Sequence, residues 1–256
     1  MARTVQDTLI VAERNLTRLK RNPELWTAFT IQPIMFTLLF VYVFGGAIRT
    51  PGFGSYEDFL IPGIIVQNIA FGGFVTALGL NEDLHKGLID RFRSLPMARP
   101  AVLAGRTLAD VATNLVSMLV LITTGYIVGF RFHGGAPDVL LGIVLLILFG
   151  YAFSWIFALL GMLVSSTEAA NTLGFITVFP LTFISSIFVP AETMPAPLEW
   201  FAGVNPFTIV TDAIRGLWLG TDTGNDVLFG FLWSFGLIAV FAPLAVRRYR
   251  RAAVSG

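Results

Sequence analysis

Few residues of this 256-residue sequence could act as catalytic groups or metal ligands. The absence of cysteine excludes a thiolate metal site and a cysteine nucleophile. The only histidines, His85 and His133, fall in loops that the predicted topology puts on opposite sides of a membrane, so they cannot share a metal ion within one chain. Neither lysine, Lys20 or Lys86, is followed by Ser or Thr, so the phosphate-binding loop Gly-x-x-x-x-Gly-Lys-Ser/Thr is missing. The sequence therefore predicts a chain that is not itself an enzyme and that binds no cofactor.

Charged side chains are also rare inside the apolar segments. Asp110 is the only acidic residue in a predicted span, and Arg106 lies four residues before it on the same helix face. We interpret these two residues as a structural ion pair near the inner membrane interface. A carrier driven by an ion gradient would need acidic residues at mid-membrane, and Asp110 is the single candidate. An ion-coupled secondary transporter is therefore the alternative function.

The composition is typical of an integral membrane protein. Hydrophobic residues make up 55% of the chain, charged residues 13%, and the mean hydropathy is +0.76; soluble proteins have about 25% charged residues. The apolar residues form six blocks that are long enough to cross a hydrocarbon core of about 30 Å as helices. The predicted fold class is all-α, with six transmembrane helices at residues 28–48, 59–80, 107–130, 139–164, 169–189 and 227–246.

The positive charges predict the orientation of these spans. With the N-terminus inside and six crossings, 14 of the 17 Lys and Arg residues fall on the inner side. A seventh span over residues 200–220 would move the basic tail, residues 247–256, to the outer side. That segment contains Asn205-Pro206, Asp212 and Arg215, so residues 190–220 are predicted to form an outer re-entrant hairpin. Both termini are expected in the cytoplasm.

Residues 1–27 contain no apolar run that could serve as the core of a signal peptide. Their apolar residues recur at helical spacing and predict an amphipathic helix that ends before Pro23. This apolar stripe consists of Val5, Leu9, Ala12, Leu16 and Leu19. The helix would lie on anionic lipid headgroups, or alternatively pack on a cytosolic partner.

The long inner loop, residues 81–99, is predicted to contain a short amphipathic helix. Acidic residues at its start and basic residues near its end suit the helix dipole, and Pro96 ends it. Its apolar stripe consists of Leu84, Leu88, Phe92 and Leu95. This stripe must be buried against the membrane surface, the chain's own helices or a second protein.

Several short motifs occur in a characteristic order along nearly the whole chain. They are Asn22-Pro23, Gln32-Pro33, Leu60-Ile-Pro-Gly63, the loop Lys86-Gly-Leu-Ile-Asp-Arg-Phe-Arg-Ser-Leu-Pro96 and Asn205-Pro-Phe207. In order and spacing the chain closely resembles type-2 ABC exporter permeases, and within them the daunorubicin and multidrug resistance permeases. The resemblance implies export of a hydrophobic or amphiphilic substrate, such as a drug, an antibiotic or a lipid-like molecule.

The resemblance also implies which residues couple to the ATPase and which line the substrate path. In that family the first inner loop carries a coupling helix that docks on a separate ATPase subunit, which binds ATP and Mg. The matching positions are Leu84, Gly87, Leu88, Asp90, Arg91, Phe92, Leu95 and Pro96. The substrate would pass between two permease subunits along the first, second and fifth spans. The matching positions there are Gln32, Phe36, Phe40, Gln67, Asn68, Phe71, Asn171, Phe175, Phe179 and Ser185.

Each of these span residues has an alternative role. The polar side chains are costly against lipid, so each one either contacts substrate or joins helices to one another. The phenylalanines either line the path or serve as packing and lipid contacts. Gly45-Gly46 and Gly72-Gly73 are expected to allow close backbone approach or hinging. Glu168 is expected near the N-cap of the fifth span, or as a second contact for the ATPase.

The resemblance implies a dimeric core in a bacterial inner membrane. The expected partners are an ABC ATPase subunit, a second copy of the permease or a related permease, and membrane lipids; no nucleic acid is expected. The domain made of residues 28–246 would be the permease. A structural or assembly membrane protein is a third possibility, and such a protein would not need the inner loop to bind an ATPase.

Overall fold

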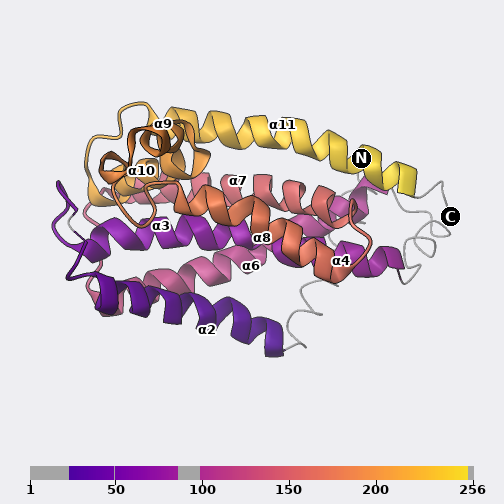
Figure 1. The fold of residues 1–256 in the computed structure, drawn as a ribbon, viewed down its shortest axis with the longest axis horizontal. Helices are drawn as coiled ribbons and strands as arrows, with labels where there is room; N and C mark the ends of the chain where they lie inside the picture. The colour runs from indigo at the N-terminus through magenta and orange to yellow at the C-terminus, as the bar shows by residue number, and fades with distance from the viewer. Residues whose placement is uncertain (1–22, 49, 86–98, 253–256) are drawn as a thin grey trace.

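The computed structural model describes residues 23–48, 50–85 and 99–252. Every regular element in these ranges is a helix (Figure 1), which confirms the all-α class. In chain order the elements are α2 (Pro23–Leu39), the π-helix η1 (Phe40–Phe44), α3 (Tyr56–Phe71), α4 (Phe74–His85), α6 (Arg99–Val128), α7 (Ala136–Gly161), α8 (Thr167–Phe183), the short η2 (Ala191–Thr193), α9 (Ala196–Val204), α10 (Pro206–Leu219) and α11 (Asp226–Ala252).

Four apolar stretches of helix are long enough to cross a membrane. They cover Tyr56–Glu82, Leu103–Val128, Ala136–Gly161 and Asp226–Tyr249. Each overlaps one of the six predicted spans. Helices α2 and α8 have 17 residues each and are shorter than the roughly 20 residues that a perpendicular crossing needs. Among the described residues the structure therefore identifies four such spans, and a count of six stays a prediction.

Helix α3 is the central element of the bundle. Of its 16 residues 12 are buried, whereas only about a third of the apolar stretch in α6 and about a tenth of that in α11 are buried. Helix α11 runs along α7 over much of its length (Figure 1). The largest buried side chains around α3 include Phe59, Phe149, Phe207 and Trp218. The interior thus combines residues from α3, α7 and α10.

The second predicted span is interrupted in the structure. Helix α3 ends at Phe71 and α4 begins at Phe74, with Gly72-Gly73 between them. A Cβ atom on Gly73 would lie 2.9 Å from the backbone of Ser154 in α7. The predicted close approach at this pair of glycines is therefore confirmed.

The fifth predicted span ends earlier than the sequence suggested. Residues 169–189 were predicted as one helix, but α8 ends at Phe183 and residues 184–189 form a non-helical connection. We call this segment the 184–189 connection. At the end of α8, two carbonyl groups accept hydrogen bonds from the side chain of Asn205, the N-cap of α10, as described below.

Helices α9 and α10 meet at Asn205 and lie together at one end of the bundle, beside the first turns of α11 (Figure 1). We call this the hairpin end. The backbone amides of His133 and Gly134, in the loop between α6 and α7, donate to the carbonyl oxygen of Trp218 at the end of α10. Gly220 follows with a φ of +71°, the left-handed conformation that commonly terminates helices. The loop between α6 and α7 thus holds the end of α10.

Candidate functional site

Phenylalanine rings from three parts of the chain form a continuous file. Neighbouring ring centroids are 4.3 to 6.4 Å apart, within the range in which aromatic rings attract one another. The aromatic file consists, in spatial order, of Phe71, Phe175, Phe179, Phe183, Phe188, Phe40, and then Phe36 and Phe44, which both contact Phe40. The file runs from the end of α3 along α8, through the 184–189 connection, to α2 and η1.

Part of the aromatic file is uncovered. Phe175, Phe179 and Phe183 lie at four-residue steps on one face of α8, and their exposed fractions are 50%, 37% and 41%. Phe188 is buried, with 5% exposed. No described element covers this face of α8, so it must meet lipid, substrate or another protein chain.

The structure brings together all five phenylalanines that the resemblance assigned to the substrate path. These are Phe36, Phe40, Phe71, Phe175 and Phe179. Their contact with substrate stays a prediction. Sequence reasoning did not identify the file members Phe44, Phe183 and Phe188. The four-residue spacing after Phe179 could have identified Phe183, but Phe188 lies beyond the helix, where periodicity gives no signal.

The polar residues assigned to the path occupy two kinds of environment. Gln67 is buried and donates through Nε2 to Thr182 Oγ1 at 3.2 Å, which joins α3 to α8. Ser185 is fully buried and donates to the carbonyl oxygen of Thr182 at 2.6 Å. Gln32 and Asn171 are exposed. Gln67 thus makes a contact between two helices, Ser185 bonds only within its own segment, and the exposed pair is open to a partner or ligand.

Asn205 both ends α8 and begins α10. Its Nδ2 donates to the carbonyl oxygens of Leu181 and Ile184, each at 2.7 Å, and its Oδ1 accepts from the backbone amide of Phe207 at 2.9 Å. Pro206 needs no partner because proline has no amide hydrogen. One side chain, 2% exposed, therefore satisfies backbone groups of two helices. These contacts give the Asn205-Pro206-Phe207 motif a physical role.

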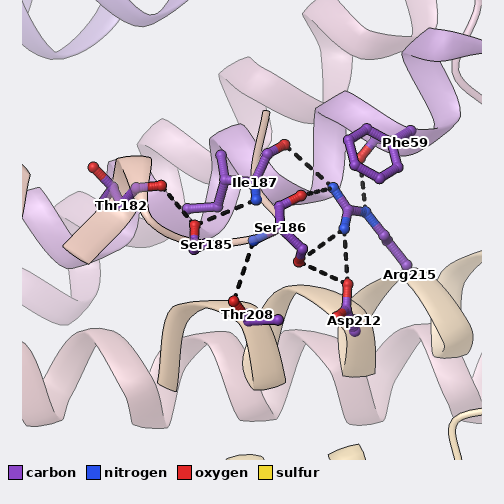
Figure 2. Close-up of polar contacts among 8 residues, drawn as sticks. All are labelled: Phe59, Thr182, Ser185, Ser186, Ile187, Thr208, Asp212 and Arg215. Atoms are coloured by element: carbon purple, nitrogen blue, oxygen red, sulfur yellow. Dashed lines mark hydrogen bonds and ion pairs between the residues drawn. The ribbon is translucent and has the colours of Figure 1, made fainter. Parts of the chain in front are cut away.

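Arg215 forms the most extensive polar cluster at the hairpin end (Figure 2). Its Nε donates to the carbonyl oxygen of Phe59 at 2.8 Å, and Nη2 donates to the carbonyl oxygens of Ser186 and Ile187 at 2.8 and 3.2 Å. Its Nη1 bonds to Asp212 Oδ1 at 2.8 Å and to Ser186 Oγ at 3.1 Å. These five bonds match the five donors of a guanidinium group. The buried cation thus ties α3, α10 and the 184–189 connection together.

A second buried polar row lies on α6, facing α3 and α4. Asp110 accepts a hydrogen bond from Thr76 Oγ1 at 2.7 Å, and both side chains are buried. Asn114 donates to the carbonyl oxygen of Ile69 at 3.3 Å, just before the break between α3 and α4. Arg106 lies over Gly79, where a Cβ atom would collide with its guanidinium group. The contact with Thr76 gives Asp110 a packing role between helices, and the ion pair between Asp110 and Arg106 stays a prediction.

The predicted coupling residues lie mostly outside the described part of the chain. Residues 87–96 are not described, and Leu84 is placed only as part of α4. Asn81, the first residue of the predicted loop, instead belongs to α4. Its buried Nδ2 donates to the carbonyl oxygens of Gly161 and Val164. The helix before the loop therefore extends beyond residue 80, to His85, and Asn81 caps the end of α7 from within it.

The start of α8 has an ordinary N-cap. Ser166 Oγ accepts from the backbone amide of Ala169 at 3.1 Å. Hydrogen bonds from its own backbone amide and from Ser166 hold the pKa of Glu168 below its ordinary value. These contacts support the structural interpretation of Glu168. Within the described residues, no three His, Asp or Glu side chains come close enough together to hold a metal ion.

Comparison with known proteins identifies related sequences along almost the whole chain. The family model for "ABC-2 type transporter" matches residues 6–219. The daunorubicin resistance ABC transporter permease protein DrrB1 of Streptomyces coeruleorubidus is 39% identical over 249 residues, which cover 97% of this chain and 88% of that protein.

Two further relatives are more distant. The probable doxorubicin resistance ABC transporter permease protein DrrC of Mycobacterium tuberculosis H37Rv is 28% identical over 251 residues, 97% of this chain and 90% of that protein. The inner membrane transport permease YadH of Escherichia coli K12 is 23% identical over 224 residues, 85% of this chain and 84% of that protein. The similarity thus spans every described helix up to α10 and, in the first two relatives, reaches 97% of the chain.

Proposed function

Because this chain belongs to the ABC-2 type transporter family and is a membrane permease component of an ABC exporter, we propose that it moves a hydrophobic or amphiphilic substrate out of the cytoplasm. The resemblance to the daunorubicin resistance permeases is confirmed by the comparisons. A drug, an antibiotic or a lipid-like molecule is the class of substrate that we propose. A separate ATPase subunit, which binds ATP and Mg, would supply the energy.

The aromatic file is the observation that carries this proposal. It offers an uncharged, partly exposed row of rings along α8, with Phe175 half exposed. A planar aromatic or acyl-chain substrate could move from ring to ring, exchanging one apolar contact for a similar one. Gln32 and Asn171, both exposed, would add hydrogen-bonding groups near such a path. A strongly charged substrate would find no counterion on the file.

We propose that the permease domain, residues 28–246, crosses a bacterial inner membrane six times. Helices α2 and α8 would be the two shorter crossings, with the 184–189 connection extending the second. The hairpin end would face outward, and both termini would lie in the cytoplasm. The support for this orientation is the excess of Lys and Arg in the segments assigned to the inner side.

A second copy of the chain, or a related permease, would cover the open face of α8 and enclose the file between two subunits. The ATPase would bind at the loop formed by residues 81–99. ATP binding would then favour one of two packings of the helices, and its hydrolysis the other. In this scheme the chain contributes differential stability of two conformations rather than catalysis.

The proposal is tested by reconstituting this chain in lipid with an ABC ATPase subunit that co-purifies with it. ATP and Mg would be added to the buffer outside inside-out vesicles. Uptake of daunorubicin into the vesicles would be followed by the quenching of its fluorescence. We expect ATP-dependent uptake by the wild type and at least about a tenfold loss for Phe175→Ala, since the substitution removes the ring that joins Phe71 to Phe179 in the file. Phe229→Ala is the matched control, because Phe229 is 46% exposed on α11 and outside the file.

Equal loss in both variants would mean that the file has no special role. Uptake that follows a proton gradient and does not need ATP would overturn the export-pump proposal. It would favour the ion-coupled alternative, for which Asp110 is the residue to replace.

A further inference from the structure

We infer that Arg215 is a positioning residue for the aromatic file: by holding the carbonyl groups of the 184–189 connection, it sets the place of the Phe188 ring between α2 and α8. This inference rests on the proposed function, since the file matters only if substrate follows it. The positioning itself is a geometric statement that can be measured without transport.

Phe188 joins the two halves of the file. Its ring centroid lies 4.7 Å from that of Phe40 in a stacked arrangement, 5.8 Å from Phe36 and 4.9 Å from Phe183. Among the ring contacts of the described residues, no other ring touches both α8 and the α2–η1 segment. A shift of Phe188 would therefore separate the rings of α8 from those of α2 and η1.

The backbone that carries Phe188 has no helix of its own to fix it. Arg215 Nη2 binds the carbonyl oxygens of Ser186 and Ile187, the two residues directly before Phe188 (Figure 2). Thr208 Oγ1 accepts from the backbone amide of Ser186 at 3.1 Å. Side chains of α10 thus hold both the amide and the carbonyl side of the connection.

The opposite side of the connection rests on α3. A Cβ atom on Gly63 would lie 2.8 Å from the carbonyl oxygen of Ile187, so this glycine lets the connection approach the α3 backbone. Arg215 Nε also binds the carbonyl oxygen of Phe59, one turn earlier on α3. The planar guanidinium group therefore fixes the distance between α3 and the 184–189 connection, because it bonds to both.

Arginine suits this position better than lysine. A guanidinium group presents five donors in a fixed fork, whereas an ammonium group presents three on one nitrogen atom. Lysine would keep the charge opposite Asp212 but could not reach Phe59 and both carbonyl groups of the connection at once. Arg215→Lys therefore removes the simultaneous hydrogen bonds to α3 and to the 184–189 connection but keeps the positive charge.

The test uses the natural absence of cysteine in this chain. Cysteines replace Phe40 and Phe188, and a short bis-methanethiosulfonate reagent joins them in membranes. We expect Arg215→Lys to lower the yield of crosslinked chain at least about threefold, because the connection loses its fixed distance from α3. Arg131→Lys is the matched control: Arg131 is exposed, hydrogen-bonds to the carbonyl oxygens of Tyr126 and Phe130, and lies over the Tyr126 ring, so these contacts stay within its own loop and the end of α6.

Transport supplies the second readout. In otherwise wild-type chains, Arg215→Lys should raise the KM for daunorubicin at least about threefold with kcat within about twofold, since substrate binding depends on the file and ATP hydrolysis does not. Asp212→Asn is a milder variant that keeps the arginine but weakens its anchor on α10. It should shift both readouts in the same direction if Arg215→Lys does not accumulate in the membrane.

Unchanged crosslinking and unchanged KM in both variants would overturn the inference and leave the proposed function intact. Conversely, crosslinking that depends on Arg215 in a complex without daunorubicin transport would support the positioning. That result would count against the proposed substrate class instead. A merely structural role would lower the amount of folded protein without changing KM.

Discussion

Arg215 contacts Phe59 in two ways at once: its guanidinium carbon lies 3.6 Å from the centroid of the Phe59 ring, and its Nε donates to the Phe59 carbonyl oxygen at 2.8 Å. The Phe59 ring packs its π face on the cation, while the Phe59 carbonyl oxygen accepts a hydrogen bond from it. A buried charge is costly unless it is paired and hydrogen-bonded, and here Asp212 and the carbonyl groups provide both. This pair joins α10 to the first turns of α3.

Phe59→Leu should separate the two contacts. The carbonyl bond to Arg215 remains, while the cation–π contact and part of the packing are lost, for a destabilisation of about 2 kcal/mol. Thermal unfolding in detergent micelles, followed by loss of monodisperse protein, measures the change. Phe229→Leu on the exposed face of α11 is the control and should leave the melting temperature nearly unchanged. If the two variants had equal melting temperatures, the Phe59 ring would stabilise the fold no more than a leucine side chain does.

Asn205 offers a test of which of its two roles matters more. Asn205→Ala removes the partners of two carbonyl groups on α8 and the N-cap of α10, which should cost about 2 to 4 kcal/mol. Asn205→Asp keeps an oxygen to cap Phe207 but points a carboxylate at the carbonyl oxygens of Leu181 and Ile184. We expect Asp to be at least as destabilising as Ala in the same thermal assay. A milder effect of Asp would mean that the N-cap dominates.

Gly72 should not tolerate a larger side chain. A Cβ atom there would lie 1.8 Å from Asn114 Oδ1, so Gly72→Ala must displace the side chain that binds the end of α3, at a cost of about 1 to 3 kcal/mol. Gly236→Ala, in α11, has nothing within 4 Å and should be neutral or stabilising by up to about 1 kcal/mol, since alanine favours helix. Chemical denaturation of both variants in mixed micelles compares them. Similar stability of the two would contradict the close contact at Gly72.

The pKa of Glu168 predicts a pH dependence with a definite sign. Glu168 precedes the fifth predicted span, and its pKa lies below the ordinary value of 4.5 because the folded state favours the carboxylate. The group therefore stabilises the fold above pH 4.5, and this contribution disappears as the pH falls through the lower folded pKa. The difference in melting temperature between wild type and Glu168→Gln should be constant at neutral pH and shrink on acidification. A difference that grows toward low pH would contradict the assignment.

Much of the fold follows from the sequence alone. The lengths of the apolar blocks located the long helices α3–α4, α6, α7 and α11, because the width of the hydrocarbon core sets a minimum helix length. From the sequence, the Asn205-Pro206 pair indicated only a poor membrane span; the structure shows that it separates α9 from α10, where asparagine supplies a cap and proline needs no amide partner. The order of the motifs identified the family, and the comparisons confirmed it.

What the sequence could not determine are the contacts between segments distant along the chain. Helix periodicity placed Phe175 and Phe179 on one face, but only the tertiary structure showed that Phe188 connects them to Phe40. In the sequence Arg215 indicated only that its segment was a poor membrane span; in the fold it is a buried anchor with five hydrogen bonds. The reason is physical: hydrophobic length and helical spacing are properties of neighbouring residues, whereas the partners of a buried polar group depend on which helices pack around it.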